Sequence, residues 1–172
     1  MIIIKLIISF LIVALAGYIG IQKAGGLSKR EYILRDMITF LKNVKNEIVY
    51  MQTILPNAFE IARQNVYFEL KDAIGQIIID MLNQKSDYIK DESIVVNISR
   101  IKNLTDYDKN VFISIIKSLG RGDVTTQINI IDNGINTLEN QVKEANEYKL
   151  SNAKVYKKMG FIMGLIIVII FI

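Results

Sequence analysis

The sequence predicts an all-α fold, an antiparallel helical bundle of about six helices that is flanked by N- and C-terminal transmembrane helices. The segment from Ile2 to Ile21 contains Lys5 as its only charged residue, and at ~1.5 Å per residue it can cross a hydrocarbon layer of ~30 Å. The segment from Gly160 to Ile172 has no polar side chain. Between them, apolar residues recur at steps of three and four, the spacing of amphipathic helices. We expect an anchor at 1–22, a helical domain at 23–158 and a membrane segment at 159–172.

The N-terminal segment also fits a removable signal peptide, because Ala14-Leu15-Ala16 matches the small-x-small cleavage pattern. Three features favour a retained anchor. The only early positive charge lies inside the apolar run, apolar residues continue to Ile21, and the Lys and Arg residues that follow would resist translocation.

The C-terminal segment is short, since about thirteen residues span only ~20 Å. A tail that lies in the membrane interface should have a polar face, and this one has none, so we expect insertion with Lys157 and Lys158 extending to the headgroups. Gly160 and Gly164 form a GxxxG pattern, and small residues with the same spacing occur in the first segment. Close pairing of the two helices through these residues and a chance occurrence of the pattern are both open. The residues concerned are Ala16, Gly20, Gly160 and Gly164.

Basic residues are concentrated on the inner side of both apolar segments. They are Lys23, Lys29, Arg30 and Arg35 after the first, and Lys149, Lys154, Lys157 and Lys158 before the last. By the positive-inside rule, the domain faces the cytoplasm and both chain ends lie outside.

Composition excludes several kinds of chemistry. The 172 residues include no His and no Cys, which removes zinc sites, iron–sulfur clusters, disulfides, thiol nucleophiles and histidine-dependent acid–base catalysis. No Gly-rich phosphate loop or dinucleotide fingerprint is present, and the basic residues do not form a stripe interleaved with aromatics as in nucleic-acid-binding proteins. We therefore expect no enzyme activity, no cofactor, no metal, no nucleic acid and no small-molecule substrate.

The first half of the domain predicts three helices and a long loop. Ser28 and Glu31 form a capping box that would start a helix running to about Gln52. Pro56 suits the first turn of a short helix that ends near Gln64. A third helix follows from Phe68 to Leu82, and the polar stretch from Lys85 to Glu92 reads as the longest loop.

The stretch from Ser93 to Leu104 contains strand-favouring Ile and Val but keeps helical spacing, so we expect a helix there. Thr105 and Asp108 make a second capping box, and Gly120 would end the helix that follows. Asp106, Asp108 and Asn110 imitate the start of a calcium loop. Val111 and Lys117 replace its required Gly and Glu, so capping is favoured.

Asp123 is expected to cap the last helix, which would run toward or into the membrane. Its apolar residues alternate steps of four and three and must be buried. They are Val124, Ile128, Ile131, Ile135, Leu138, Val142 and Ala145. Several other amphipathic helices need a partner, which favours an intramolecular bundle over a coiled-coil dimer through this seam.

Three motifs give the chain a resemblance to the stage III sporulation protein AB family of endospore-forming bacteria. The first is Glu47-Ile48-Val49-Tyr50 followed by Thr53-Ile54-Leu55-Pro56 and Ala58. The second is Leu119-Gly120-Arg121-Gly122-Asp123 with Gln127 one turn later, and the third is Tyr156 with Gly160-Phe161 and Gly164. Ile54 and Gly122 depart from the usual family residues, and the family's central tryptophan is absent. The resemblance covers essentially the whole length.

The resemblance implies a non-enzymatic scaffold in the mother-cell membrane around the forespore, a subunit of the channel between the two cells during engulfment. The family's cytoplasmic domain is similar to the helical domain of type II secretion F and type IV pilus platform proteins. By that analogy the expected partners are a hexameric secretion-type ATPase of the same operon and the other stage III membrane subunits, with homo-oligomers also conceivable. The candidate partner-contact residues are Glu47, Pro56, Asn57, Gly120, Asp123 and Gln127.

Each of these residues also has a purely structural explanation. Glu47 could make a hydrogen bond or ion pair within the bundle, Gly120 and Asp123 suit turns and caps, and Gln127 could reach back to the preceding loop. At the level of the whole protein, two other classes compete with the scaffold. One is a membrane-anchored sensor or adaptor with an extracytoplasmic helical domain. The other is a secreted helical protein cleaved after Ala16, whose apolar tail would be hard to keep soluble.

Overall fold

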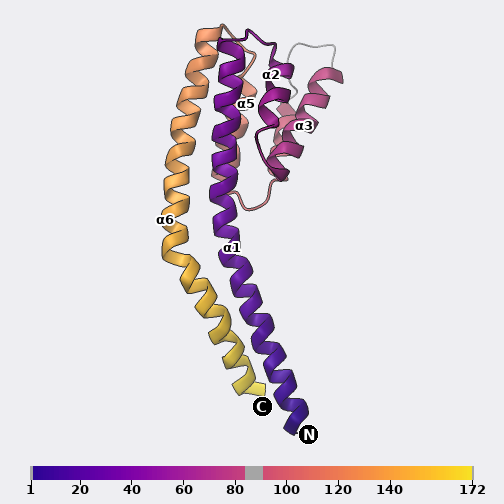
Figure 1. Ribbon diagram of the computed structural model, residues 1–172, viewed down its shortest axis with the longest axis vertical. Coiled ribbons are helices and arrows are strands. Elements are labelled where there is room, and N and C mark those ends of the chain that lie inside the picture. The colour runs from indigo at the N-terminus through magenta and orange to yellow at the C-terminus, as the bar shows by residue number, and fades with distance from the viewer. Residues whose placement is uncertain (1, 84–90, 172) are drawn as a thin grey trace. The chain divides into compact units, whose positions relative to one another are not determined.

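A computed structural model describes residues 2–83 and 91–171, and every regular element in this part is a helix (Figure 1). The elements are α1 (Ile2–Val49), α2 (Leu55–Arg63), α3 (Phe68–Asn83), α4 (Asp91–Ser99), α5 (Asp106–Ser118) and α6 (Val124–Phe171). The all-α class is therefore confirmed. The predicted loop Lys85 to Glu92 lies mostly outside the described residues, and its last two residues already belong to α4.

The chain packs as two compact units, and α1 and α6 contribute to both. The helical unit comprises residues 31–143, and the helix-pair unit comprises residues 1–30 and 144–172. The predicted limits at 22 and 158 mark where the chain would enter the membrane. Contacts within the chain do not test these limits, so they stay predictions.

Three phenylalanines form the centre of the helical unit. Phe40 of α1, Phe59 of α2 and Phe112 of α5 are fully buried. The Phe40 ring centroid lies 5.1 Å from that of Phe59 and 6.1 Å from that of Phe112, both in edge-to-face geometry. Such aromatic pairs are worth about 0.5–1.5 kcal/mol beyond the area they bury. The amphipathic faces of three helices thus meet at one point in the core.

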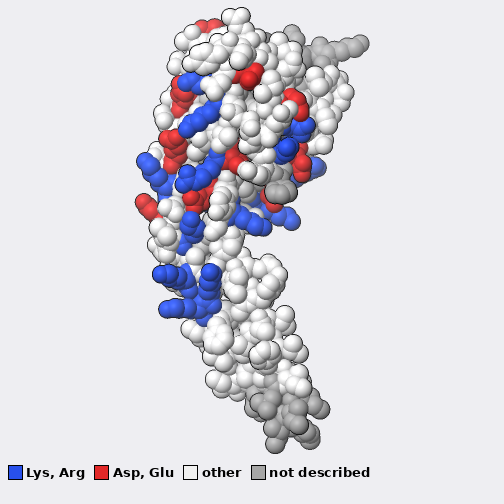
Figure 2. Space-filling model, in the orientation of Figure 1, with Lys and Arg blue, Asp and Glu red and all other residues white. Residues whose placement is uncertain are grey.

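Within the helical unit, α1 and α6 run antiparallel. Lys45 reaches both carboxylate oxygens of Asp132 at 2.7 Å, and Lys42 lies 3.4 Å from Glu139. Residues of the predicted seam from Ile131 onward are buried inside the chain, whereas Val124 is exposed. A coiled-coil dimer through this seam is therefore wrong, because the chain itself covers it. The visible surface of the unit carries both signs of charge intermingled (Figure 2).

Both boundaries of α1 differ from the prediction. The helix α1 continues through Ser28, so Ser28 is not an N-cap. Ala24 is only 3% exposed in this stretch, although Gly25 and Gly26 each cost a helix about 1 kcal/mol. At its other end α1 stops at Val49, before Gln52 adopts a left-handed φ of 52°.

The other turn and cap assignments are confirmed. Pro56 lies in the first turn of α2, and Thr105 and Asp108 form a reciprocal capping box at α5, which accounts for the calcium-like residues. Gly120 has a φ of 79°, a conformation that suits glycine. The helix expected from Ser93 to Leu104 is present only in part: α4 ends at Ser99, and the residues after it form a turn.

One helix in the described part of the chain, Ile7–Val49, contains a stretch long and apolar enough to cross a membrane, judged by length and composition. Crossing by the C-terminal segment 159–172 therefore stays a prediction.

Candidate functional site

The turn between α1 and α2 is held by one acidic side chain. The Thr53 hydroxyl donates to Glu47 Oε2 at 2.9 Å, and the Thr53 backbone N–H donates to the Glu47 carbonyl at 3.1 Å. Gln52 adopts its left-handed conformation between them. Glu47 therefore makes a hydrogen bond within the bundle, which is the structural role expected for it as the alternative to a partner contact.

The turn between α5 and α6 is held in a similar way by Gln127. Its Oε1 accepts the Gly120 backbone N–H at 3.3 Å, and its Nε2 donates to the Gly122 carbonyl at 3.3 Å. Gln127 thus bonds to the preceding loop, which is the structural role expected from the sequence as the alternative to a partner contact.

Asp123 completes this turn as the N-cap of α6. Its Oδ1 accepts the Thr126 backbone N–H at 3.1 Å. Hydrogen bonds from the Thr126 side chain and backbone favour the charged carboxylate and hold the pKa of Asp123 below its ordinary value. Arg121 in the same turn donates to Asp91 at 2.8 Å and so ties the turn to the first residue of α4.

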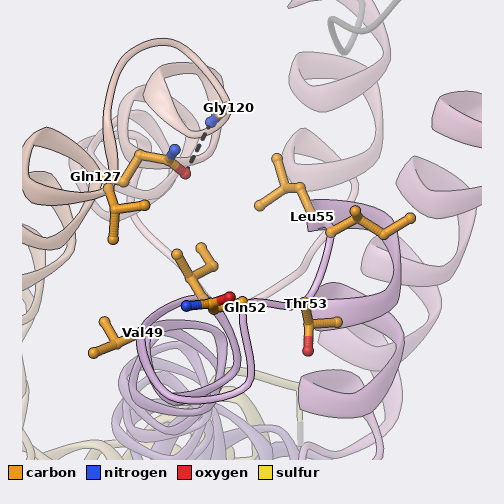
Figure 3. A pocket seen from close by; sticks show the side chains of 9 residues that line it. Val49, Gln52, Thr53, Leu55, Gly120 and Gln127 are labelled. Atoms are coloured by element: carbon orange, nitrogen blue, oxygen red, sulfur yellow. Dashed lines mark hydrogen bonds between the residues drawn. The ribbon is translucent and has the colours of Figure 1, made fainter.

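The two turns meet across a cleft of about 430 Å³ (Figure 3). Gln127 and Gly120 lie on one side, Leu55 and Thr53 lie on the other, and Val49 and Gln52 close the base. The Leu55 side chain lies 3.2 Å from the point that a Cβ on Gly120 would occupy. Two motifs that are more than sixty residues apart in sequence are therefore in contact.

The chemistry of this cleft is apolar and uncharged. No Asp, Glu, Lys or Arg lines it, and its polar groups come from two glutamines, one threonine and the backbone. Two of the apolar residues that line it are exposed, Ile54 at 66% and Val124 at 49%. Such a surface suits a protein segment, and it lacks the cationic groups that hold a phosphate.

The predicted contact residues are only partly brought together. Gly120 and Gln127 line the cleft, Glu47 and Asp123 shape its two turns, and Pro56 and Asn57 lie beside it in the first turn of α2. Sequence reasoning missed Gln52 and Val124. The left-handed backbone of Gln52 has no signature in the sequence, whereas Val124, next to Asp123, was assigned to the buried seam. Among the described residues, no group of three or more acidic side chains could hold a metal ion.

The small residues of the helix-pair unit form a second cluster. A Cβ on Gly20 would lie 2.7 Å from the Tyr156 carbonyl oxygen, and one on Gly160 would lie 2.7 Å from the Ala16 carbonyl oxygen. A Cβ on Gly164 would lie 2.9 Å from Val13 Cα. The antiparallel backbones therefore touch at Ala16, Gly20, Gly160 and Gly164. Whether a membrane surrounds this contact stays a prediction.

The family model for stage III sporulation protein AB matches residues 5–172, and so takes in all three motifs. The chain belongs to this family. It is accordingly a stage III sporulation protein. No curated protein and no solved structure matches the chain.

Proposed function

We propose that this chain is a non-enzymatic scaffold subunit of the mother cell–forespore channel complex and that it docks a secretion-type ATPase. Its place would be the mother-cell membrane around the forespore, with the helical unit in the cytoplasm. Family membership and the apolar stretch of α1 support this proposal.

The cleft between the two motif turns is the observation that carries the docking proposal. Its walls depend on two polar side chains that already have partners: Glu47 accepts the Thr53 hydroxyl, and Gln127 bonds to the backbone of Gly120 and Gly122. Exposed Ile54 and Val124 line this uncharged cleft. Contiguous exposed apolar side chains with a polar border are typical of protein-binding surfaces.

The helix arrangement fits a protein that anchors or transmits force generated elsewhere. The helices α1 and α6 are each continuous over 48 residues. In sequence, the cleft turns follow α1 and precede α6, and the apolar segments are the first part of α1 and the last part of α6. Without a phosphate loop of its own, the chain would depend on a separate ATPase for energy.

The test uses the full chain in nanodiscs and the purified ATPase of the same operon. Ile54→Arg and Asn57→Arg place a charge beside the cleft, and we expect each to weaken binding by about tenfold or more, the effect of losing ~1.4 kcal/mol. Asn110→Arg is the matched control on the exposed surface of α5. Gln127→Arg is unsuitable, because it also breaks the bonds to Gly120 and Gly122.

The three variants should keep thermal stability within about 0.5 kcal/mol of wild type, as is usual for surface substitutions. Spore formation should fail only in the two cleft variants. Absence of binding by the wild-type chain in nanodiscs would overturn docking and leave a passive membrane scaffold.

Orientation is tested separately by thiol labelling, which this cysteine-free chain allows without background. Asn140 is exposed on α6 within the helical unit. Asn140→Cys should react with a membrane-impermeant reagent only after the cell membrane is opened. Labelling in intact cells would favour the sensor with an extracytoplasmic domain.

A further inference from the structure

A groove of about 330 Å³ runs along the helix-pair unit beside the glycine contact. Its sides are the apolar chains of Ile19, Met159, Met163 and Ile167, and it also contains Lys23 and Tyr156. From Tyr156 to Ile167 the groove follows about three turns of α6, or roughly 16 Å at the helical rise of 1.5 Å per residue.

The groove exists because the two backbones are in contact. Gly20 and Gly160 have no side chains at the point where the helices cross. The larger side chains of Ile19 and Met159 next to them form the sides of an open groove. Ile19, Met159 and Met163 each expose more than half of their surface. A channel of this kind is apolar along its length and suits a flexible hydrocarbon chain.

Charge is distributed asymmetrically around the groove. Residues 1–30 and 148–172 contain no Asp or Glu. Lys23 lies at the groove, and Lys154, Lys157 and Lys158 occupy the turns of α6 around Tyr156. Figure 2 shows a band of blue side chains next to a surface whose described atoms are all white. A cationic border beside an apolar surface is complementary to an anionic headgroup on an acyl chain.

We propose that this groove binds one anionic glycerophospholipid. The acyl chain would lie along Ile19, Met159 and Met163, and the phosphate would meet the Lys23 ammonium. The proposal rests on membrane insertion of the two apolar segments. The apolar length of the groove distinguishes a lipid from free phosphate, and the basic border disfavours a zwitterionic headgroup whose outer charge is positive.

The test uses the full chain reconstituted in vesicles of phosphatidylglycerol or phosphatidylcholine, extracted in mild detergent and weighed by native mass spectrometry. Wild type should retain one phosphatidylglycerol and no phosphatidylcholine. Lys23→Gln should lower the retained fraction about fivefold relative to Lys29→Gln. Lys29→Gln is the matched control, since it removes the same charge from an exposed position away from the groove.

A second pair of variants tests the apolar part. Ile19→Trp fills the groove and should expel the lipid, whereas Ile21→Trp, also exposed but outside the groove, should not. Circular dichroism of all four variants verifies that the helices persist. Equal losses for Lys23→Gln and Lys29→Gln would reduce the effect to general surface attraction and overturn the site. Lipid retained by Ile19→Trp, or lipid displaced by excess inorganic phosphate, would overturn it as well.

Failure of this site is distinguishable from failure of the proposed function. A wild-type chain found in the membrane fraction of cells but without retained phosphatidylglycerol would refute the lipid site alone. A chain found in the soluble fraction would refute membrane insertion, and with it both proposals.

Discussion

Thr53 donates both its hydroxyl and its backbone N–H to Glu47, at 2.9 Å and 3.1 Å. The two bonds close the turn that follows α1 and fix Gln52 in its left-handed conformation. Leu55 is thereby directed toward Gly120 of the second motif. Glu47 of the first motif therefore helps to determine the shape of the cleft by holding the turn at Thr53.

Removing this carboxylate should loosen the turn. We expect Glu47→Ala to lower the free energy of unfolding by about 1–2 kcal/mol, because a partly buried hydrogen bond to a charged group is lost. Glu47→Gln should cost less, since its amide oxygen still accepts from Thr53. Thermal unfolding of the full chain in detergent, followed by circular dichroism, measures both. Equal effects of the two variants would mean that charge, rather than the acceptor, holds the turn.

The helix pair should depend on Gly20 and not on Gly17 or Gly25 of the same helix. Gly20→Leu places a side chain where the Tyr156 carbonyl and the Gly160 backbone already lie, whereas Gly17 and Gly25 have open space around them. Spin labels on Ile7→Cys and Ile170→Cys should give a narrow distance distribution in an otherwise wild-type chain. Gly20→Leu should broaden it and Gly17→Leu should not. Broadening by both would indicate that any bulky residue disturbs the helix.

Local signals allowed most of the helical unit to be predicted. The Thr105 and Asp108 box, Pro56 and Gly120 each mark a boundary through the chemistry of a few neighbouring residues, and the structure has them where expected. The Ser28 and Glu31 pattern is equally good as a local signal, yet α1 passes through it. Whether a cap pattern starts a helix also depends on how the preceding residues pack, and Ala24 before Ser28 is buried. The residues that bury it are not part of the local pattern.

The site could be predicted only in outline. The antiparallel bundle and the residues Gly120 and Gln127 were expected, but the packing of Leu55 beside Gly120 depends on the left-handed backbone of Gln52, which no sequence pattern indicated. The exposure of Val124 was mispredicted. Val124 has the same heptad spacing as the buried residues Ile131 and Leu138. It differs from them only because it is the first residue of α6, where the buried face of that helix has not yet begun.

Two acidic side chains of the helical unit should give opposite pH dependences. Partial burial raises the pKa of Asp36 above its ordinary value of 3.8, against the opposing effect of the Tyr67 N–H that donates to it. Hydrogen bonds from Arg63 hold the pKa of Glu60 below its ordinary value of 4.5. In the folded state Asp36 therefore binds a proton more readily than in the unfolded chain, and Glu60 less readily.

The sign of each contribution follows from proton binding. Stability from Asp36 is present below pH 3.8 and is lost as pH rises through its raised pKa, whereas stability from Glu60 is present above pH 4.5 and is lost as pH falls through its lowered pKa. Between pH 7 and pH 3, wild type should gain stability relative to Asp36→Asn and lose it relative to Glu60→Gln. Urea unfolding at each pH measures the differences. Parallel curves for wild type and Asp36→Asn would contradict the assigned role of Asp36.

Replacing Gln141 with an apolar residue should stabilise the helical unit. Gln141 is 2% exposed on α6, and neither its Nε2 nor its Oε1 has a hydrogen-bond partner among the described residues. A buried polar group without a partner costs about 1–3 kcal/mol, so Gln141→Leu, of similar volume, should raise the free energy of unfolding by about that amount. Asn140→Leu is the matched control, since Asn140 is exposed on the same helix and its replacement should change stability by less than about 0.5 kcal/mol. Chemical unfolding of the full chain in detergent measures both variants. A loss of stability in Gln141→Leu would show that the amide has a partner in the folded protein, and the cost assigned to it here would then be wrong.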